Sequence, residues 1–199
     1  MFISATGNPD KLREIVAILG DEIELLPRPD GLAEPEEDAT TLEGNARIKA
    51  LCVANATGLP AIADDTGLEV DALGGEPGVR SARFAGENAS YADNIELLSE
   101  RLEGVVKKAR SARFRTVALA RWPDGEEVIA EGVLEGSIAE TPSGNNGFGY
   151  DPIFIPTDSN GRTLAQMSNS EKNTISARGK AFRELISKCA GWDLNPHGL

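Results

Sequence analysis

The stretch MFISATGNPDKLREIVAILG, residues 1–20, gives the first indication of the fold class. Its first five residues form a short apolar run typical of a strand, and Thr6-Gly7 predicts a turn. Asn8-Pro9 then predicts a helix start, with Asn as N-cap and Pro at the first helical position. Apolar residues recur at helical spacing until Gly20, which predicts the helix end. A strand–turn–helix unit of this kind indicates an α/β fold.

The remaining sequence keeps mixing the two kinds of element, with no internal repeat. We expect further strands at residues 23–26, 61–63, 68–73, 113–122, 126–139 and 153–155, and further helices at 41–57, from 90 onward and at 176–189. Residues 27–40 are rich in proline and acid and predict a surface loop, and residues 74–88 predict a long connection. Pro123-Asp124-Gly125 predicts a hairpin turn. The sequence therefore predicts one α/β domain, residues 1–199, with a mixed sheet.

Composition excludes several classes of function. The 199 residues include 32 Asp+Glu and 20 Lys+Arg, a net charge of −12, which argues against a nucleic-acid or anionic-membrane binder. No run approaches the roughly 18 apolar residues that cross a bilayer, and residues 1–7 lack a signal-peptide pattern, so we expect a cytoplasmic protein. Cys52 and Cys189 form no CxxC motif, and the single His197 lies near the end. Chemistry must therefore rest on carboxylates, lysines, arginines and a metal.

Two adjacent carboxylates give the strongest local indication of a site. Asp64 and Asp65 follow the apolar run Ala61-Ile62-Ala63 and come before Thr66-Gly67. Buried carboxylates are costly unless a cation neutralises them, and hard oxygen ligands suit Mg²⁺ held together with a substrate phosphate. The alternative is an Asp-rich turn that caps its own backbone.

Two helix starts carry a weaker phosphate or metal signal. The segment from Thr6 to Lys11 offers backbone N–H groups and a lysine to a phosphate, but it is also simply a well-capped helix start. Glu43 can be a magnesium ligand or the third residue of a capping box that begins at Thr40. Lys49 lies four residues from Asn45 on another face of that helix and can serve a phosphate or stay solvated.

Two later segments have the character of a base-binding site. In residues 143–152 glycines and asparagines allow close backbone approach, Phe148 offers a flat face, and Asp151 offers acceptors to ring N–H groups. In residues 171–180 Lys172 and Arg178 can reach base oxygens or phosphates. Ordinary turns and a polar helix entry are the alternatives.

Taken together, these segments resemble the noncanonical purine nucleoside triphosphate pyrophosphatases, the inosine triphosphatase family. The matching motifs are Thr6-x-Asn8-x-x-Lys11, Glu43-x-Asn45-Ala46, Ala63-Asp64-Asp65-Thr66-Gly67-Leu68, Gly75-x-Pro77-Gly78, Ser81-Ala82-Arg83-Phe84-Ala85-Gly86, Phe148-Gly149-Tyr150-Asp151-Pro152, Met167-Ser168-x-x-Glu171-Lys172-Asn173 and Arg178-Gly179-Lys180. Each motif is weak alone, but their order and spacing across residues 5–180 are highly specific.

The resemblance implies an elongated mixed-sheet α/β fold with two lobes and a central nucleotide-binding cleft, usually in a homodimer. It implies Mg²⁺-dependent hydrolysis of ITP, dITP and XTP to the monophosphate and pyrophosphate. By matching position, Asp65 is the catalytic proton acceptor, and Glu43 and Asp65 are the metal ligands. The substrate-binding residues implied in the same way are Thr6, Gly7, Asn8, Lys11, Lys49, Thr66, Phe148, Gly149, Tyr150, Asp151, Lys172 and Arg178.

One departure from the family pattern leaves alternatives open. The family reads Ser-His-Arg where this chain reads Ser176-Ala177-Arg178. The absent histidine usually belongs to the nucleotide site, so we expect Ala177 to weaken binding or rate without changing the fold. The alternatives are a weakly active nucleotide-binding protein and a Maf-like pyrophosphatase that acts on other modified nucleotides.

Overall fold

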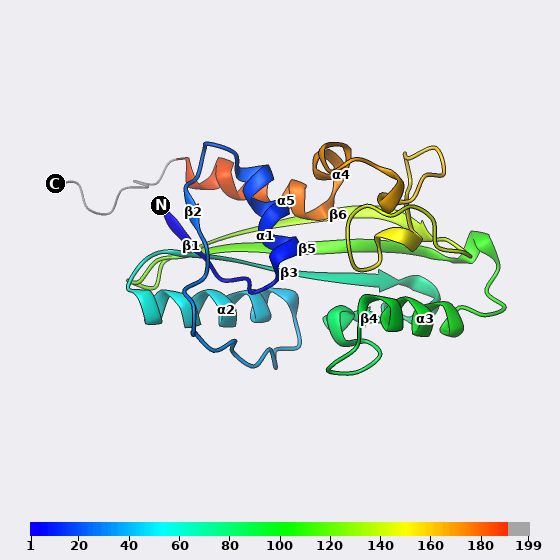
Figure 1. Ribbon diagram of the computed structural model, residues 1–199, viewed down its shortest axis with the longest axis horizontal. Coiled ribbons are helices and arrows are strands. Elements are labelled where there is room, and N and C mark those ends of the chain that lie inside the picture. The colour runs from blue at the N-terminus through cyan, green and yellow to red at the C-terminus, as the bar shows by residue number, and fades with distance from the viewer. Residues whose placement is uncertain (191–199) are drawn as a thin grey trace. The chain divides into compact units, whose positions relative to one another are not determined.

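The computed structural model describes residues 1–190, and its elements mix helices and strands along the chain (Figure 1). The strands are β1 (Phe2–Ser4), β2 (Leu25–Leu26), β3 (Ala61–Val70), β4 (Pro77–Gly78), β5 (Ser111–Arg121), β6 (Glu127–Ile138) and β7 (Phe154–Pro156). The helices are α1 (Pro9–Leu19), α2 (Leu42–Thr57), α3 (Tyr91–Arg101), α4 (Asn169–Ile175) and α5 (Ala177–Cys189). The tail beyond residue 190, with His197, lies outside the described residues. No helix up to that point has both the length and the apolar character needed to cross a bilayer.

The strands form one mixed sheet in the order β2-β1-β3-β5-β6-β7, with β4 paired to β3. β1 runs parallel to both β2 and β3, whereas β4 and β7 run antiparallel to β3 and β6. β5 and β6 are joined by the predicted hairpin turn, closed by Trp122 N–H donating to the Glu126 carbonyl (2.9 Å). The predicted α/β class with a mixed sheet is therefore confirmed.

Strand β3 differs from the prediction at Asp64 and Asp65. We expected a short strand that ends before Asp64-Asp65, and instead one strand of ten residues, Ala61–Val70, runs straight through both carboxylates. Both residues are buried, at 1% and 6% exposure. The two carboxylates do not end the strand because the cations described below neutralise them.

Several smaller expectations also change. Ser176 ends α4, a short helix that the sequence reading missed, and α5 begins one residue later than predicted. The connection at 74–88 contains β4 and a turn of 3₁₀ helix, Ser81–Arg83. The predicted strand at 23–26 is reduced to Leu25–Leu26, and the one at 153–155 shifts to Phe154–Pro156 behind a 3₁₀ turn. Residues 27–40 form a loop, as predicted.

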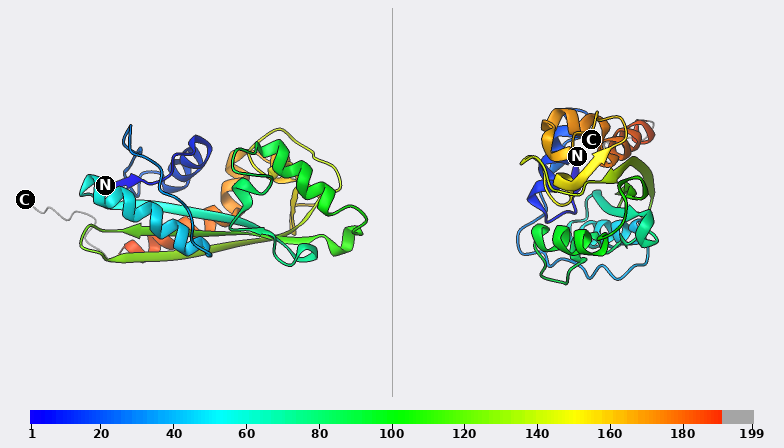
Figure 2. Two further views of the ribbon diagram at one scale, coloured as in Figure 1. Left: turned by 90° about the horizontal axis from the view of Figure 1, so that it is seen from below. Right: turned by 90° about the vertical axis from the view of Figure 1, so that its right-hand side faces the viewer.

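The chain divides into two compact units. Unit 1 comprises residues 1–65, 116–132 and the chain from 177 onward, and unit 2 comprises residues 66–115 and 133–176. Within unit 1, α1 packs against α5 on one face of the strands, and α2 lies on the other face (Figure 2). The division falls inside β3, β5 and β6, so these three strands contribute residues to both units.

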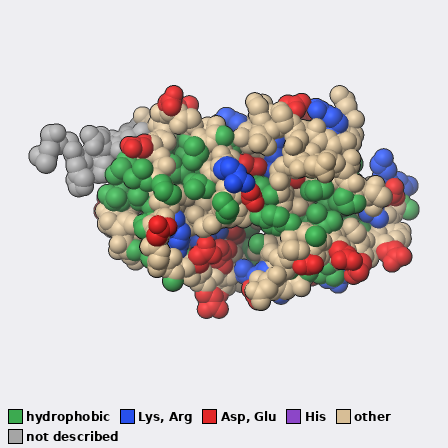
Figure 3. Space-filling model, viewed as in Figure 1, with side chains coloured by type: hydrophobic (Ala, Val, Ile, Leu, Met, Phe, Trp, Pro, Cys, Tyr) green, Lys and Arg blue, Asp and Glu red, His purple; other side chains and the backbone are tan. Residues whose placement is uncertain are grey.

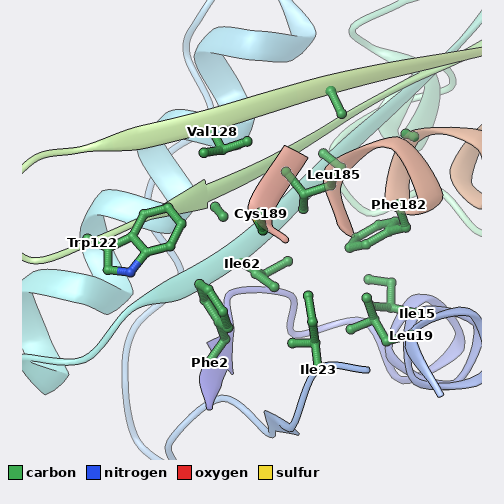
Figure 4. Packing of buried hydrophobic residues seen from close by; sticks show 14 residues of the cluster. Phe2, Ile15, Leu19, Ile23, Ile62, Trp122, Val128, Phe182, Leu185 and Cys189 are labelled. Carbon is green, nitrogen blue, oxygen red and sulfur yellow. The ribbon is translucent and has the colours of Figure 1, made fainter. Parts of the chain in front are cut away.

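The large apolar core belongs to unit 1 (Figure 4). Phe2 of β1 meets Trp122 edge to face, with ring centroids 5.4 Å apart, while Leu19 of α1 and Phe182 of α5 are fully buried. Aromatic and aliphatic side chains of this size contribute about 1.5–3 kcal/mol each when buried. The core fixes β1, β3, α1 and α5 relative to one another, and those elements carry the charged residues of unit 1.

Candidate functional site

The first group of predicted residues is centred on Asp65, in the middle of β3. Lys49 Nζ lies 2.9 Å from Asp65 Oδ1, and Asn45 Nδ2 donates to Asp65 Oδ2 at 3.3 Å. Asn45 and Lys49 are four residues apart on α2, so they share one face of that helix, as predicted, and that face is turned toward β3. A carboxylate held in this way has a fixed orientation and stands beside a buried ammonium.

The neighbouring Asp64 is held by a different set of cations. Arg178, at the start of α5, donates from both Nε (3.1 Å) and Nη2 (3.0 Å) to Asp64 Oδ2, and Lys11 Nζ lies 3.9 Å from the same oxygen. Arg178 Nη1 also pairs with Glu14 of α1. Two helices from distant parts of the sequence, α1 and α5, therefore converge on one carboxylate of β3.

These neighbours determine the charge states. Burial alone would raise the pKa of the Asp64 carboxyl, but the surrounding cations, Lys11 foremost, outweigh burial and hold that pKa well below its usual range. Burial alone would lower the pKa of the Lys49 ammonium, but the nearby carboxylates, Asp65 foremost, outweigh it and raise that pKa. At neutral pH Asp64 is therefore a carboxylate and Lys49 an ammonium, whereas burial lowers the pKa of the Lys11 ammonium.

The start of α1 is the well-capped helix start that its sequence suggested. Asn8 is the N-cap, and its Oδ1 accepts from the N–H groups of Asp10 (2.9 Å) and Lys11 (3.3 Å). Thr6 Oγ1 in turn accepts from Asn8 N–H at 3.2 Å. Because Asn8 already satisfies two of the helix N–H groups, a phosphate here would depend mainly on the side chains of Thr6 and Lys11.

An acidic segment, residues 27–41 between β2 and α2, lies against the same groups. Acidic side chains gather over this segment on the face seen in Figure 3. Glu37 Oε1 lies 3.4 Å from Lys49 Nζ. A Cβ atom added to Gly7 would lie 1.8 Å from Glu34 Oε1, so the Glu34 carboxylate fills the space that only glycine leaves there. The segment therefore presents two carboxylates to residues expected to bind phosphate.

Glu43, the second expected metal ligand, has other partners. The capping-box alternative is wrong, because α2 begins at Leu42 and its N-cap Thr41 accepts from Gly44 rather than from Glu43. The Glu43 side chain is half exposed and pairs with Arg47 Nη2 at 2.7 Å. Arg47 also bonds Glu127 of β6 at 2.8 Å.

A second group of predicted residues lies in unit 2 and combines an aromatic ring with one buried ion pair. Asp151 Oδ2 accepts from the Phe148 backbone N–H at 2.8 Å and pairs with Lys172 Nζ. Lys172 Nζ lies 4.7 Å from the centroid of the Phe148 ring, a cation–π distance. The side chains of Asp151 and Lys172 are only 4% and 6% exposed, so their charges are largely shielded from water.

The backbone around Phe148 needs its glycines. Gly147 and Gly149 both have positive φ, at 73° and 60°, and a Cβ at Gly147 would lie 2.0 Å from Asp151 Oδ2. Tyr150 is buried, and its hydroxyl donates to the Ser81 carbonyl at 2.9 Å. Burial raises the pKa of the Tyr150 hydroxyl, so it remains a neutral donor. Thr66 follows Asp65 on β3 and is half-buried.

The predicted residues thus fall into two groups. Unit 1 brings together Lys11, Lys49, Asp65 and Arg178, and unit 2 brings together Phe148, Asp151 and Lys172. Sequence reasoning missed Glu14, Glu37 and Arg47, whose roles appear only through long-range ion pairs. It also missed Tyr91, which meets the Phe148 ring with centroids 5.9 Å apart. The missed helix α4 did have a signal in the sequence, the capping box Ser168-x-x-Glu171.

The comparisons with known proteins agree closely with one another. Residues 2–188 match the sequence profile of the Ham1 family. A dITP/XTP pyrophosphatase of Elusimicrobium minutum is 49% identical over 94% of this chain and 98% of its own length. One from Geobacter sulfurreducens is also 49% identical, over 96% of both chains.

Solved structures give the same result. A HAM1 protein from Coxiella burnetii superposes with a TM-score of 0.86 at 42% identity, over 96% of this chain and all of the other. The Ham1 protein of Staphylococcus aureus superposes with a TM-score of 0.83 at 38% identity, over 96% and 98% of the two chains.

Proposed function

This chain belongs to the Ham1 family, and from that membership we propose that it is a nucleoside triphosphate pyrophosphatase. Its substrates are the noncanonical purine nucleotides ITP, dITP and XTP, which it hydrolyses to the monophosphate and pyrophosphate and so removes from the nucleotide pool. The observation that carries the proposal is the 49% identity, over nearly the whole chain, to proteins named for dITP and XTP pyrophosphatase activity.

Unit 1 supplies groups suited to the phosphoryl chemistry. In the proposed reaction Asp65 accepts a proton from water, and the water oxygen attacks the α-phosphorus. The bond from that phosphorus to the bridging oxygen breaks, and pyrophosphate leaves. The buried Lys49 ammonium, 2.9 Å from Asp65, fixes the orientation of the carboxylate and offers positive charge to the phosphates. Thr6, Gly7, Asn8, Lys11 and Thr66 complete the phosphate-binding set.

The carboxylates of unit 1 fit Mg²⁺ if the metal binds together with the substrate. Among residues 1–190 no three or more His, Cys, Asp or Glu side chains stand close enough together to hold a metal. Mg²⁺ usually takes one or two carboxylates, keeps several waters and shares the substrate phosphates, so these residues suit a metal that binds together with the triphosphate. Glu43 and Asp65 would hold it. When bound, the metal neutralises phosphate charge.

Unit 2 supplies groups suited to recognition of the base. In the proposal Phe148 stacks on the purine, Gly149 and Tyr150 shape its surroundings, and Asp151, Lys172 and Arg178 bind its edge. Donors such as the Lys172 ammonium match a 6-oxo group and leave the 6-amino group of adenine without an acceptor. This difference favours ITP and XTP over ATP.

The two alternatives receive different degrees of support. The relatives described above are named for dITP and XTP rather than for pyrimidine or methylated nucleotides, so no observation favours the Maf-like alternative. The weakly active alternative rests on Ala177 and is decided by the assay below. We further propose that the enzyme is cytoplasmic and that it forms a homodimer. Size-exclusion chromatography with light scattering would test the homodimer.

The decisive experiment measures pyrophosphate release from ITP, dITP, XTP, GTP and ATP in the presence and absence of Mg²⁺. We expect turnover of the first three nucleotides only with Mg²⁺. Asp65→Asn should lower kcat by about 10²–10⁴-fold for every substrate, the usual contribution of a general base. Asp21→Asn, an exposed aspartate in the same unit, is the matched control and should retain full activity. Equal activity of Asp65→Asn and the wild type would remove Asp65 from its role.

A further inference from the structure

The ring expected to stack on the base has a second aromatic ring beside it. Tyr91, the first residue of α3, meets Phe148 with ring centroids 5.9 Å apart and planes inclined by 39°. The two residues are 57 positions apart in sequence, since 148 − 91 = 57, but both belong to unit 2. The two rings therefore lie next to each other in unit 2.

Both rings are held by well-bonded backbone. Tyr91 follows Ser90, whose backbone N–H donates to Asp93 Oδ2 at 2.7 Å while its hydroxyl accepts from Asp93 N–H at 3.2 Å. One turn further, Asn94 accepts from Ala85 N–H at 2.8 Å, which ties the start of α3 to the preceding loop. Phe148 is held by its own N–H bond to Asp151. Hydrogen bonds therefore hold the backbone that carries each ring.

The two tyrosines of the chain differ in a way that points to a ligand. Tyr150 is 5% exposed, and its hydroxyl has a structural partner in the Ser81 carbonyl. Tyr91 is 42% exposed although it contacts Phe148, so a large part of its side chain remains open to a bound molecule. Aromatic surface open to solvent beside a half-buried ring and a buried ion pair has the features of a base-stacking platform.

The size of this surface suggests what it selects. A phenyl ring alone covers about one ring of a base, whereas a purine has two fused rings. On the basis of the function proposed above, we propose that Tyr91 is a specificity-determining residue. Together with Phe148 it forms a two-ring surface that receives the bicyclic purine, while a single-ring base gains little from the second ring. Stacking of a base on an aromatic side chain contributes about 1–3 kcal/mol.

The test compares Tyr91→Ala, Tyr91→Leu and Tyr91→Phe with the wild type. For ITP we expect Tyr91→Ala and Tyr91→Leu to raise KM by roughly tenfold, the lower part of the stacking range, with kcat within about twofold. Tyr91→Phe should keep the wild-type KM, because it retains the ring. Inhibition by inorganic triphosphate, which has no base, should be unchanged in all three. Val106→Ala, another exposed apolar residue of unit 2, is the control and should change nothing.

The outcomes separate this inference from the proposed function. Equal KM values of the wild type and Tyr91→Ala for ITP overturn the inference. A lower KM of Tyr91→Ala also overturns it, because Tyr91 would then hinder binding of the base. If the wild type releases no pyrophosphate, the proposed activity fails, and calorimetric titration with ITP then tests Tyr91 directly. The inference is supported if the wild type binds ITP and if both Tyr91→Ala and Tyr91→Leu weaken that binding. It is overturned if the wild type does not bind ITP. Melting temperatures of the variants identify any loss of folding, and Tyr91→Phe provides the conservative check.

Discussion

Units 1 and 2 both contain buried charges, but they organise them differently. In unit 1 a connected set of cations and carboxylates surrounds Asp64 and Asp65, and each carboxylate has more than one polar partner. In unit 2 one ion pair, Asp151 with Lys172, stands beside an aromatic ring. The first arrangement suits a ligand with several charges, and the second suits a flat, nearly neutral one. The function proposed above requires both kinds of group.

The largest expected effect comes from removing one charge in each unit. Asp64→Asn leaves Arg178 and Lys11 without their shared carboxylate, and it should lower the free energy of unfolding by about 3–5 kcal/mol. Asp151→Asn leaves one cation and should fall at or below the low end of that range, about 3 kcal/mol. Urea unfolding of both variants at pH 7 measures the difference. An Asp151→Asn loss equal to or larger than that of Asp64→Asn would contradict the comparison.

Different parts of unit 1 can be predicted from the sequence to different degrees. The start of α1 at Asn8-Pro9 and the shared face of Asn45 and Lys49 follow from local patterns, and the structure confirms both. The course of β3 through Asp64-Asp65 was not predictable, because carboxylates inside a strand are tolerated only where cations neutralise them. Those cations come from residues up to 114 positions away. Local sequence patterns therefore predict the helices and strands but not the long-range ion pairs.

The next effect tests the departure at Ala177. This residue is 3% exposed at the start of α5, and its carbonyl oxygen would lie 2.1 Å from a Cβ on Gly132, so its backbone is closely packed. If a histidine belongs to the nucleotide site, Ala177→His should raise kcat/KM for ITP by about tenfold, the effect of one charge-assisted hydrogen bond. Ala177→Phe is a control of similar size without ring nitrogens. An unchanged kcat/KM, or an equal gain in the control, removes the hypothesis.

A smaller change would show whether the acidic segment weakens substrate binding. Glu37 is a partly exposed partner of Lys49, and such a pair contributes about 0.2–1 kcal/mol. Glu37→Gln releases positive charge toward the phosphates and should lower KM for ITP a few-fold, with kcat unchanged. Glu36→Gln, an exposed neighbour in the same segment, is the control. A lower kcat in Glu37→Gln would instead assign Glu37 to the reacting centre.

The smallest effect concerns unit 2 alone and depends on pH. Hydrogen bonds from Ser90 lower the pKa of the Asp93 carboxyl at the start of α3. A carboxyl with a lowered native pKa stabilises the fold above its ordinary pKa of about 4, and this contribution is lost as pH falls through the native value. Asp93→Ala should therefore unfold at slightly lower urea than wild type at pH 7, and the two midpoints should converge below pH 4. A gap that widens in acid would have the wrong sign.

The acidic segment affects which phosphate compounds can compete with the proposed substrate. In the proposed phosphate site Glu34 lies against Gly7 and Glu37 pairs with Lys49, so a bound nucleotide would replace these carboxylates with its phosphates. A ligand with a single phosphate offers little advantage over the resident carboxylates, whereas a triphosphate offers several charges at once. The carboxylates of the segment would therefore select against ligands with few charges. We expect orthophosphate to inhibit the enzyme far more weakly than pyrophosphate does.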